Sequence, residues 1–535
     1  MSEPREALAD VSAAVSADPS ADTPASFWEW AQRRPDHLAV RTPSGQGVTY
    51  GELLRRVNQF SHALRALGVG TRERIAVLLS NDRTFFEVAL GAQQVGVHLV
   101  PVNTHLSPGE IAYIVQDCAA RLVITDAVLA ETAGAALDSI GYPENDRIAA
   151  DDQPGGRLLS ALLDGMSVEL PDDRVFAQTM LYTSGTTGRP KGVVYPVTAN
   201  VTPELATAAV APIMARRGMR TDPDAVSLVT GPLYHGAPGA WGLQGLHRGH
   251  SVVLLRRWDS EQVLALIERE RVTTAQMAPI HFFRLLQLPE EVRRKYDLSS
   301  LRVVSHAGAA CPVDVKARMM EWLGPVLYEY YASSEGYGTS IGPQEWLARP
   351  GSVGLATGDG ATMKVLDDDG NELGPDDVGT LWIKNPGGLL SEYLNDPGKT
   401  AANHRDGFYT AGDQARIDPD GWLYIVDRRV DLILSGGVNI YPAEVERVIS
   451  DHPQVAEVAV VGAPDPEWGQ RVHAVIVPTA DAVPGDELRQ SITEHAARAL
   501  GSFKQPRTIE FRASLPYTPT GKLLRRVLAD EVSRA

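Results

Sequence analysis

The first part of the chain alternates short apolar runs with longer segments in which apolar residues recur every three or four positions. The runs at 75–79, 97–100 and 122–124 are typical of buried strands, because a strand covered on both faces needs no polar alternation. Between them, segment 85–94 has the apolar spacing of a helix, and a longer helix is predicted to begin at Thr49. Strands that alternate with helices indicate a largely parallel sheet, so we expect an α/β fold.

The same alternation returns in the middle of the chain. Five further strands are predicted, at 226–229, 252–255, 273–277, 301–305 and 326–330. A helix is predicted at 260–271. From Met363 onward, short apolar stretches are separated by Asp-Gly and Pro-Gly turns, which is typical of a β-rich subdomain.

A charged connector at 428–431 precedes a final segment of about a hundred residues, a normal size for a small domain. We therefore predict a large N-terminal domain over 26–429, built from stacked α/β sheets and the β-rich subdomain. A small α+β C-terminal domain follows over 430–535. Residues 1–25 are rich in Ala, Ser, Asp and Pro, and we expect a disordered tail there.

Composition narrows the class of protein. The chain has 535 residues, of which 44% are hydrophobic, and no apolar run reaches the length of a transmembrane helix. Its net charge of −17 argues against nucleic acid as a bulk partner. The two cysteines, Cys118 and Cys311, suggest neither a disulfide framework nor a metal-thiolate site. A cytoplasmic location is expected.

Segment 183–192 concentrates small polar groups and positive charge. In order it reads Thr183, Ser184, Gly185, Thr186, Thr187, Gly188, Arg189, Pro190, Lys191 and Gly192. Glycines let backbone N–H groups approach a phosphate closely, hydroxyls donate to phosphate oxygens, and the cations supply charge. Because apolar runs flank the segment, we expect a phosphate-binding loop between two strands rather than an ordinary surface loop.

This loop differs from the P-loop of many nucleotide-binding proteins. Counting from Gly185, Lys191 has the P-loop spacing, but Pro190 stands where a glycine is required. Gly192 stands where Ser or Thr is required. The P-loop interpretation therefore fails at two positions.

Six other stretches carry side chains suited to nucleotide or acyl chemistry. They are 232–241, 305–310, 331–335, 408–413 and the pair formed by 426–446 with 515–526. Small residues at 305–310 would let a flat ring lie on the backbone. Glu335 is a carboxylate of the kind that binds Mg²⁺ beside phosphates, and Asp413 can accept two hydroxyl hydrogen bonds.

Together these stretches resemble the signatures of the adenylate-forming enzymes, which include acyl-CoA synthetases, peptide adenylation domains and firefly-type luciferases. The match of 183–192 is complete at every fixed position of that signature, and the motifs occur in family order from about Phe27 to Arg526. Within this superfamily, the sequence most resembles bacterial fatty-acyl or aryl-CoA ligases. The resemblance implies that the C-terminal domain is mobile.

The resemblance assigns roles residue by residue. It implies ATP binding by Thr183, Ser184, Gly185, Thr186, Thr187, Gly188, Lys191, Gly308, Ala309, Ala310, Tyr331, Ala332, Ser334, Asp413, Ile425 and Arg428. It implies that Glu335 and Thr183 hold Mg²⁺, and that Lys522, Glu335 and Arg428 are catalytic. Lys522 would carry positive charge to the reacting carboxylate and α-phosphate.

The acyl and thiol sites are implied in the same way. The substrate pocket would contain His235, Gly236, Ala237, Trp241, His306 and Gly308. Gly436 and Gly437 would line the tunnel for CoA. The chain departs from the family pattern at Ala332, Ser334 and Ala411, and Val430 occupies the hinge position, where Asp or Lys is usual. This last departure concerns how the hinge is stabilised.

We therefore expect an ATP-dependent acyl- or aryl-CoA ligase that releases pyrophosphate, with ATP, Mg²⁺ and CoA as cofactors. Three alternatives stay open. One is an adenylating enzyme with another acceptor: a carrier-protein thiol, an amine, or, after nitrite activation, an arylamine. The second is a luciferase-like oxygenase. The third is a regulator without catalysis, against which Lys522, Glu335 and Asp413 argue. The acid and any homodimer are not readable from the sequence.

Overall fold

The computed structural model describes residues 26–153, 156–183, 190–308, 311, 313–367, 369–428, 433–440, 442–516 and 525–534. The expected tail 1–25, the loop residues 184–189, Ala309 and Ala310, Val430 and Lys522 lie outside the described residues.

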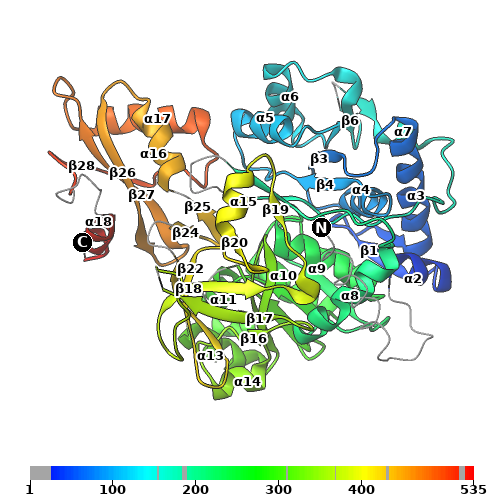
Figure 1. The fold of residues 1–535 in the computed structure, drawn as a ribbon. Helices are drawn as coiled ribbons and strands as arrows, with labels where there is room; N and C mark the ends of the chain where they lie inside the picture. Colours follow the sequence, from blue (N-terminus) through cyan, green and yellow to red (C-terminus); the bar gives the residue numbers. More distant parts are fainter. Residues whose placement is uncertain are drawn as a thin grey trace.

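Two sheets of mainly parallel strands form the large domain (Figure 1). The first is fully parallel, in the order β4 (His98–Pro101), β3 (Arg74–Leu78), β5 (Leu122–Thr125), β6 (Arg147–Ala149) and β7 (Arg157–Leu158). These strands include three of the apolar runs predicted as buried strands, and the mixed α/β fold class is confirmed.

The second sheet has nine strands. Its order is β16 (Leu355–Ala356), β15 (Gly336–Ile341), β14 (Leu327–Ser333), β13 (Val303–His306), β12 (Thr274–Met277), β10 (Val226–Val229), β11 (Ser251–Leu254), β1 (Leu38–Arg41) and β2 (Gly47–Thr49). The strands from β14 to β1 run parallel, and the edge strands are antiparallel. The predicted strands therefore divide between two sheets, a division that the apolar runs alone did not indicate.

Helices cover these sheets on both faces. In the large domain they are α2 (Phe27–Arg33), α3 (Tyr50–Ala66), α4 (Arg83–Gln93), α5 (Pro108–Asp117), α6 (Ala130–Ser139), α7 (Leu159–Leu163), α8 (Pro203–Arg216), α9 (Gly236–His247), α10 (Ser260–Arg269), α11 (Pro279–Leu286), α12 (Glu290–Arg293), α13 (Val313–Leu323), α14 (Pro343–Ala348) and α15 (Pro397–Asn403). Capping boxes begin α3 at Thr49 and α5 at Ser107, as expected where a hydroxyl is followed three residues later by Glu.

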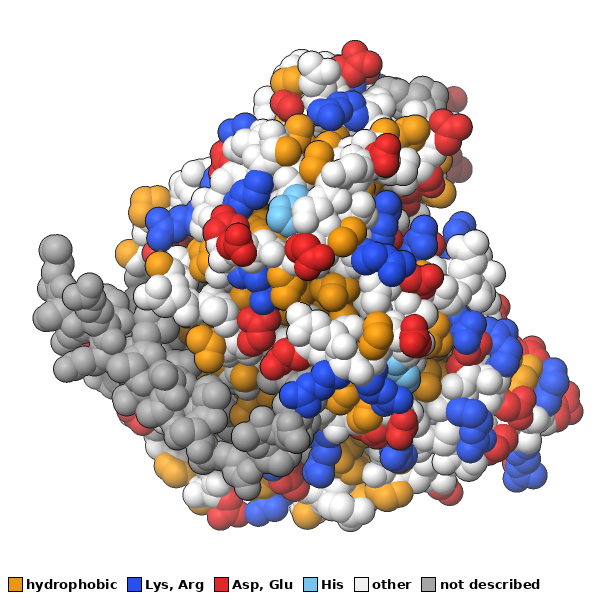
Figure 2. All heavy atoms as spheres, turned by 90° about the vertical axis from the view of Figure 1, so that its right-hand side faces the viewer, with side chains coloured by type: hydrophobic (Ala, Val, Ile, Leu, Met, Phe, Trp, Pro, Cys, Tyr) orange, Lys and Arg blue, Asp and Glu red, His pale blue; other side chains and the backbone are white. Residues whose placement is uncertain are grey.

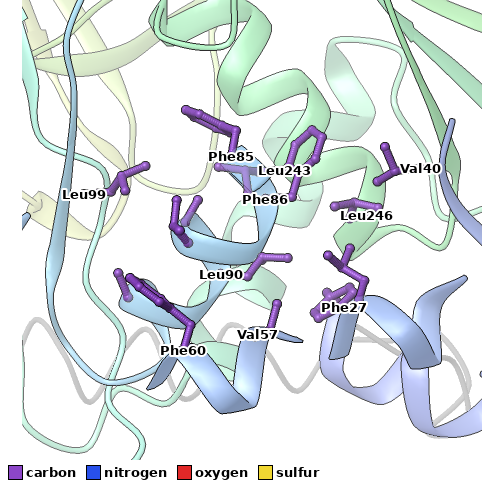
Figure 3. Packing of buried hydrophobic residues seen from close by; sticks show 14 of the residues in the cluster. Phe27, Val40, Val57, Phe60, Phe85, Phe86, Leu90, Leu99, Leu243 and Leu246 are labelled. Carbon is purple, nitrogen blue, oxygen red and sulfur yellow. The ribbon is translucent and has the colours of Figure 1, made fainter. Parts of the chain in front are cut away.

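Helices α4 and α9 lie between the two parallel sheets, and one hydrophobic cluster joins all these elements (Figure 3). The helices approach closely because α9 carries glycines: a Cβ on Gly242 would lie 2.8 Å from Cζ of Phe86, and one on Gly239 would lie 2.4 Å from the carbonyl oxygen of Leu233. The absence of a side chain at Gly242 therefore serves packing between α4 and α9.

Two smaller sheets complete the large domain. A three-stranded sheet contains β8 (Leu181–Thr183), β9 (Lys191–Val194) and β19 (Glu392–Tyr393). The β-rich part contains β17 (Thr362–Leu366), β18 (Gly379–Lys384), β20 (His404–Arg405), β21 (Phe408–Tyr409), β22 (Asp413–Ile417) and β23 (Leu423–Arg428). The change to short apolar stretches and turns, which the sequence shows near Met363, corresponds to the start of this sheet.

The small C-terminal unit has its own sheet and core. Its strands are β24 (Ile433–Ser435), β25 (Val438–Ile440), β26 (Val455–Asp465), β27 (Gly469–Pro478) and β28 (Thr508–Phe511). Its helices are α16 (Pro442–Ser450), α17 (Asp486–Ala499) and α18 (Arg525–Arg534). A separate hydrophobic cluster forms between this sheet and helices α16 and α17, as expected for a small α+β domain with its own core.

The surface carries charge of both signs. Figure 2 shows acidic and basic side chains interspersed on one face, with hydrophobic side chains between them. In the described part of the chain, no helix is long and apolar enough to cross a membrane.

One lysine joins the small unit to the large domain. Lys504 is almost fully buried, and its Nζ donates to Glu110 of α5 at 2.7 Å and to Glu444 of α16 at 2.6 Å. Glu110 also accepts a hydrogen bond from the backbone N–H of Gly501 at 3.0 Å. Ser107 Oγ donates to the carbonyl oxygen of Ala499. This interdomain contact is therefore polar, buried and fully paired, as a buried charge requires.

A second contact lies on the other side of the small unit. Arg284 of α11 donates to Glu467 at 2.8 Å, and its guanidinium lies 5.0 Å from the ring centroid of Trp468. Both partners belong to the turn between β26 and β27. Two separated contacts fix the orientation of the small unit better than either alone.

The backbone of Gly501 lies close to that of His105, so a side chain at Gly501 should weaken the interdomain contact around Lys504. A Cβ at this position would lie 2.3 Å from the carbonyl oxygen of His105, which is backbone and cannot turn aside. We expect Gly501→Ala to disfavour the contact by about 1–3 kcal/mol. The measurement is the rate of limited proteolysis at the connector near 428–433, which should rise. Gly485→Ala is the matched control, because a Cβ there meets nothing within 4 Å. Equal rates in the two variants would contradict this interpretation.

The carboxylates around Lys504 predict a pH dependence. Burial, together with the charge of Glu110, raises the pKa of Glu444 to about 7, although Lys504 opposes this shift. Separation of the two units would remove Glu110 and admit water, so the pKa of Glu444 would fall. The joined arrangement thus binds more protons between about pH 4.5 and 7, and its stability decreases as the pH rises through that window.

We expect fluorescence energy transfer between labels on the two units to report this separation. The fraction of joined molecules should fall between about pH 4.5 and 7. Glu110→Gln removes the neighbouring negative charge and should flatten the pH profile. A profile unchanged by this substitution would show that another group titrates.

Candidate active site

A large cavity of about 2970 Å³ lies at the carboxyl ends of the parallel strands of the nine-stranded sheet. Loops that follow β10, β12, β13 and β14 line it, through residues such as His235, Ala278, Gly308 and Glu335. Parallel strands end at the same edge, so residues far apart in sequence converge there, which is the usual place for a ligand in such folds.

The hairpin of β8 and β9, whose strands flank the predicted phosphate loop, borders this cavity. Thr183 and Lys191 pair across the hairpin, and both line the cavity. The Lys191 Nζ donates to Asp396 at 2.6 Å, and this hydrogen bond lowers the pKa of Asp396. Ser184, Gly185, Thr186, Thr187 and Gly188 lie outside the described residues. The strands on either side of this segment form the hairpin that the flanking apolar runs predicted.

Residues predicted to bind the nucleoside come together from three strands. The Tyr331 hydroxyl donates to the Asp413 carboxylate, which is almost fully buried and lines the cavity. Tyr331 and Ile425 pack against the same small hydrophobic cluster. Asp413 pairs with Arg428 in the register of β22 and β23, so the Arg428 backbone lies beside this group. The arrangement could hold a flat base and a ribose.

Glu335 is a buried carboxylate on the cavity wall, with 7% of its surface exposed. Its side chain accepts a 2.7 Å hydrogen bond from the Tyr393 hydroxyl, and its backbone carbonyl accepts one from the Asn385 amide. A carboxylate held in this way, close to the hairpin that carries Thr183, fits a Mg²⁺ ion bound between protein and phosphate oxygens. Ser334, Ala332 and Gly308 line the same cavity.

The wall expected to hold the acyl group is only partly as predicted. His235, Gly236 and Ala237 line the cavity, and the ring of Tyr234 lies 4.7 Å from that of His235. Burial, with a smaller effect from His105, lowers the pKa of His235 to about 4. His235 is therefore neutral at neutral pH and can meet an uncharged group.

Two residues predicted for the same wall lie elsewhere. His306 is the last residue of β13, and its ring packs edge-on against Phe282, 5.0 Å away, beside the buried Lys316–Glu329 ion pair. Successive side chains of a strand alternate between faces, so the face of β13 that carries His306 is the one behind the cavity. Trp241 is buried in the hydrophobic cluster of Figure 3 and does not line the cavity.

The small unit closes one side of the cavity. Gly436 and Gly437, in the turn between β24 and β25, line it together with Trp468 and Arg525. A Cβ on Gly436 would lie 2.4 Å from the Trp468 ring, so only glycine fits against that ring. Lys522 lies outside the described residues. In this arrangement the glycine turn, Trp468 and Arg525 are described parts of the small unit that border the cavity.

Sequence reasoning missed several residues of this site. Asn385 connects the Tyr337 backbone to the Glu335 carbonyl, and the Tyr195 hydroxyl donates to the Ser334 carbonyl. Arg217, at the end of α8, also lines the cavity. None of them lies in a stretch that resembles a family signature.

Similar proteins act on carboxylic acids. The chain is 33% identical to the fatty acid–[acyl-carrier-protein] ligase ScoC of Streptomyces coeruleorubidus, over 94% of both chains. It is also 33% identical to a feruloyl-CoA synthase of Amycolatopsis sp, over 93% of this chain and 97% of the relative.

Solved structures share the arrangement. The amide bond synthetase McbA of Marinactinospora thermotolerans matches with a TM-score of 0.82 at 27% identity, over 95% of this chain and all of the other. A double mutant of the o-succinylbenzoate CoA synthetase of Bacillus subtilis, bound to a product analogue, gives 0.79 at 27% identity over 95% and 98%. ATP-bound MatB of Rhodopseudomonas palustris gives 0.65 at 26% identity over 95% and 99%.

Family profiles cover both parts of the chain. The family described as AMP-binding enzyme matches residues 27–394, and the AMP-binding enzyme C-terminal domain matches residues 444–522. Together with the relatives, these matches show that the chain belongs to the AMP-binding, adenylate-forming enzyme family and is an ATP-dependent, AMP-forming ligase.

Proposed function

We propose that this ligase activates a carboxylic acid as an acyl-adenylate and transfers the acyl group to CoA. The observation that carries this proposal is the convergence of four parts on one cavity: the β8–β9 hairpin, the Asp413 and Glu335 carboxylates, the wall at His235 and the glycine turn at Gly436. A nucleotide, an acid and a thiol each have a matching part of the wall.

In the first half-reaction, a carboxylate oxygen of the acid bonds to the α-phosphorus of ATP, and the bond to pyrophosphate breaks. Asp413 would hold the ribose and the hairpin loop the phosphates, which positions the acid and nucleotide for in-line attack. Glu335 and Thr183 would hold Mg²⁺, whose positive charge offsets that of the phosphates. Lys522 and Arg428 would stabilise the charge that develops at the α-phosphate.

In the second half-reaction, the CoA thiolate bonds to the acyl carbon, and the carbon–oxygen bond to AMP breaks. The described arrangement supports this step, because the glycine turn at Gly436 and Gly437 faces the cavity. The TM-score is higher for the synthetase bound to a product analogue than for ATP-bound MatB, although the sequence identity and the coverage are nearly equal. We infer that the small domain is placed differently in the two solved structures.

A second candidate function differs only in the acceptor. The relative ScoC is named for transfer to an acyl carrier protein, and McbA for amide bond synthesis. Either a carrier-protein thiol or an amine would enter from the side that the small unit borders. The acid-activating half-reaction is the same in each case, so the acceptor must be tested separately.

The decisive experiment is acid-dependent exchange of labelled pyrophosphate into ATP over a panel of carboxylic acids, with nitrite included. We expect at least one acid to support exchange in the presence of Mg²⁺ and CoA to be consumed with that acid. If no acid supports exchange, the proposal is wrong. If exchange occurs without CoA consumption, assays with amines and carrier protein identify the acceptor.

Lys522→Ala should separate the two half-reactions. Loss of its charge at the α-phosphate should lower the rate of adenylation by about 100-fold or more, as for other single electrostatic contacts in active sites. Thioester formation from a preformed acyl-adenylate should be retained. Rapid-quench measurement of each half-reaction provides the comparison.

Lys295→Ala is the control for this substitution, because Lys295 forms an exposed ion pair with Glu261 away from the cavity. It should leave both rates unchanged. Equal losses in the two half-reactions of Lys522→Ala would refute the assignment of Lys522 to adenylation alone.

A further inference from the structure

We propose that Arg217 binds a second anionic group on the acid, so that the preferred substrate is a dicarboxylic acid activated at one end only. This inference rests on the proposed function and narrows its substrate class. It comes from a buried cation on the cavity wall that has no carboxylate partner among the described residues.

Arg217 is held in place by the end of its helix. It caps α8, and the following residue, Gly218, has a φ of 90°, a conformation that suits glycine at a helix end. A Cβ on Gly218 would lie 2.5 Å from Val303 of β13, so this turn is pressed against the sheet. The Arg217 side chain therefore starts from a fixed backbone position.

The guanidinium lies against β14 and β15. Its Nη2 donates to the Tyr337 carbonyl oxygen at 2.6 Å, and its Cζ lies 4.1 Å from the ring centroid of Tyr330. Arg217 is 8% exposed, and all three residues line the cavity. Within the described part of the chain, its Nε has no hydrogen-bond partner. The carbonyl and the ring orient the guanidinium but leave donors unused.

The surroundings of Arg217 do not neutralise its charge. The ionisable groups that act on it from β14, β15 and β21 are the phenols of Tyr330, Tyr337 and Tyr409. Burial raises the pKa of each of these phenols, so all three are uncharged at neutral pH. A buried cation without a counter-ion is costly, and an anion that enters the cavity would offset that cost.

Lys504 and Lys316 provide an internal comparison. Lys504 has two carboxylate partners, and Lys316 donates to Glu329 at 2.6 Å. Where this fold buries those lysines in its structure, it supplies a carboxylate. Arg217 lines the cavity and, unlike these two lysines, has no carboxylate partner among the described residues. This difference favours a carboxylate partner that belongs to the ligand.

The position of Arg217 sets the length of the acid. Tyr330, under the guanidinium, precedes Ser333 by three residues of β14, roughly 10 Å of extended chain. Ser333 and Ser334 lie at the end of the strand, beside Glu335 and the expected phosphates. A carboxylate at Arg217 and a second one at the reaction centre would therefore belong to an aryl or medium-chain diacid rather than to a very short one. Arg is suited to a planar carboxylate because its donors form a fork.

The test uses matched pairs of acids in the pyrophosphate exchange assay: 4-methylbenzoate with terephthalate, cinnamate with 4-carboxycinnamate, and octanoate with octanedioate. We expect the wild-type protein to favour the diacid of at least one pair by about tenfold or more in kcat/KM. Arg217→Met should lower kcat/KM for that diacid by about tenfold or more and change the matched monoacid by less than about threefold. Arg217→Lys should restore part of the preference.

Arg216→Met is the matched control, because the neighbouring Arg216 is half exposed and pairs with Glu345 on the surface. It should leave the preference for the diacid unchanged. If Arg217 only ties α8 to the sheet, its substitution would instead lower the Tm and reduce exchange with both members of a pair equally.

The possible failures are distinguishable. If no acid supports exchange, both the proposed function and this inference are wrong. If monoacids support exchange and the wild-type protein favours them in every pair, the ligase function stands and this inference is overturned. Because the wild-type preference is measured without a variant, the outcome does not depend on the folding of Arg217→Met.

Discussion

The pairing of Lys504 with one carboxylate from each domain is the interaction on which the shape of the active site depends. Lys504 and Glu444 belong to the small unit, and Glu110 belongs to α5 of the large domain. A buried lysine must be paired in any arrangement, and Glu444 alone can satisfy its charge if the units separate. Glu110 therefore adds a contact that can be gained and lost without leaving the lysine unpaired. This property suits a joint that holds Gly436 against the cavity and then releases it.

Much of the fold was predictable because its elements have strong local signals. The buried strands of both parallel sheets appear as apolar runs, and the capping boxes at Thr49 and Ser107 mark helix starts. The division of these strands between two sheets was not predictable. That division depends on contacts such as Gly242 against Phe86, between residues more than 150 positions apart, and a glycine in a sequence does not indicate what it packs against.

The candidate site shows the same limit at the level of single side chains. Motif residues such as Glu335 and Asp413 reached the cavity because their motifs fix both backbone and side chain. His306 and Trp241 did not, although they stand beside motif glycines, because strand alternation and helix rotation turned them toward hydrophobic packing. Arg217 was missed for the opposite reason: an arginine before a glycine at a helix end is a common capping pattern, and only burial distinguishes it.

Two of the described cations that line the cavity bear on the role proposed for Lys522. Lys191 reaches the phosphate hairpin, but its charge is already matched by Asp396 at 2.6 Å. Arg217 lies against the ring of Tyr330, where we propose that it meets the second carboxylate of the acid. A reaction in which two anions, the carboxylate and the α-phosphate, must meet needs positive charge between them. With Lys191 paired to Asp396 and Arg217 proposed for the second carboxylate, we propose that Lys522 of the small unit supplies charge at the reacting atoms.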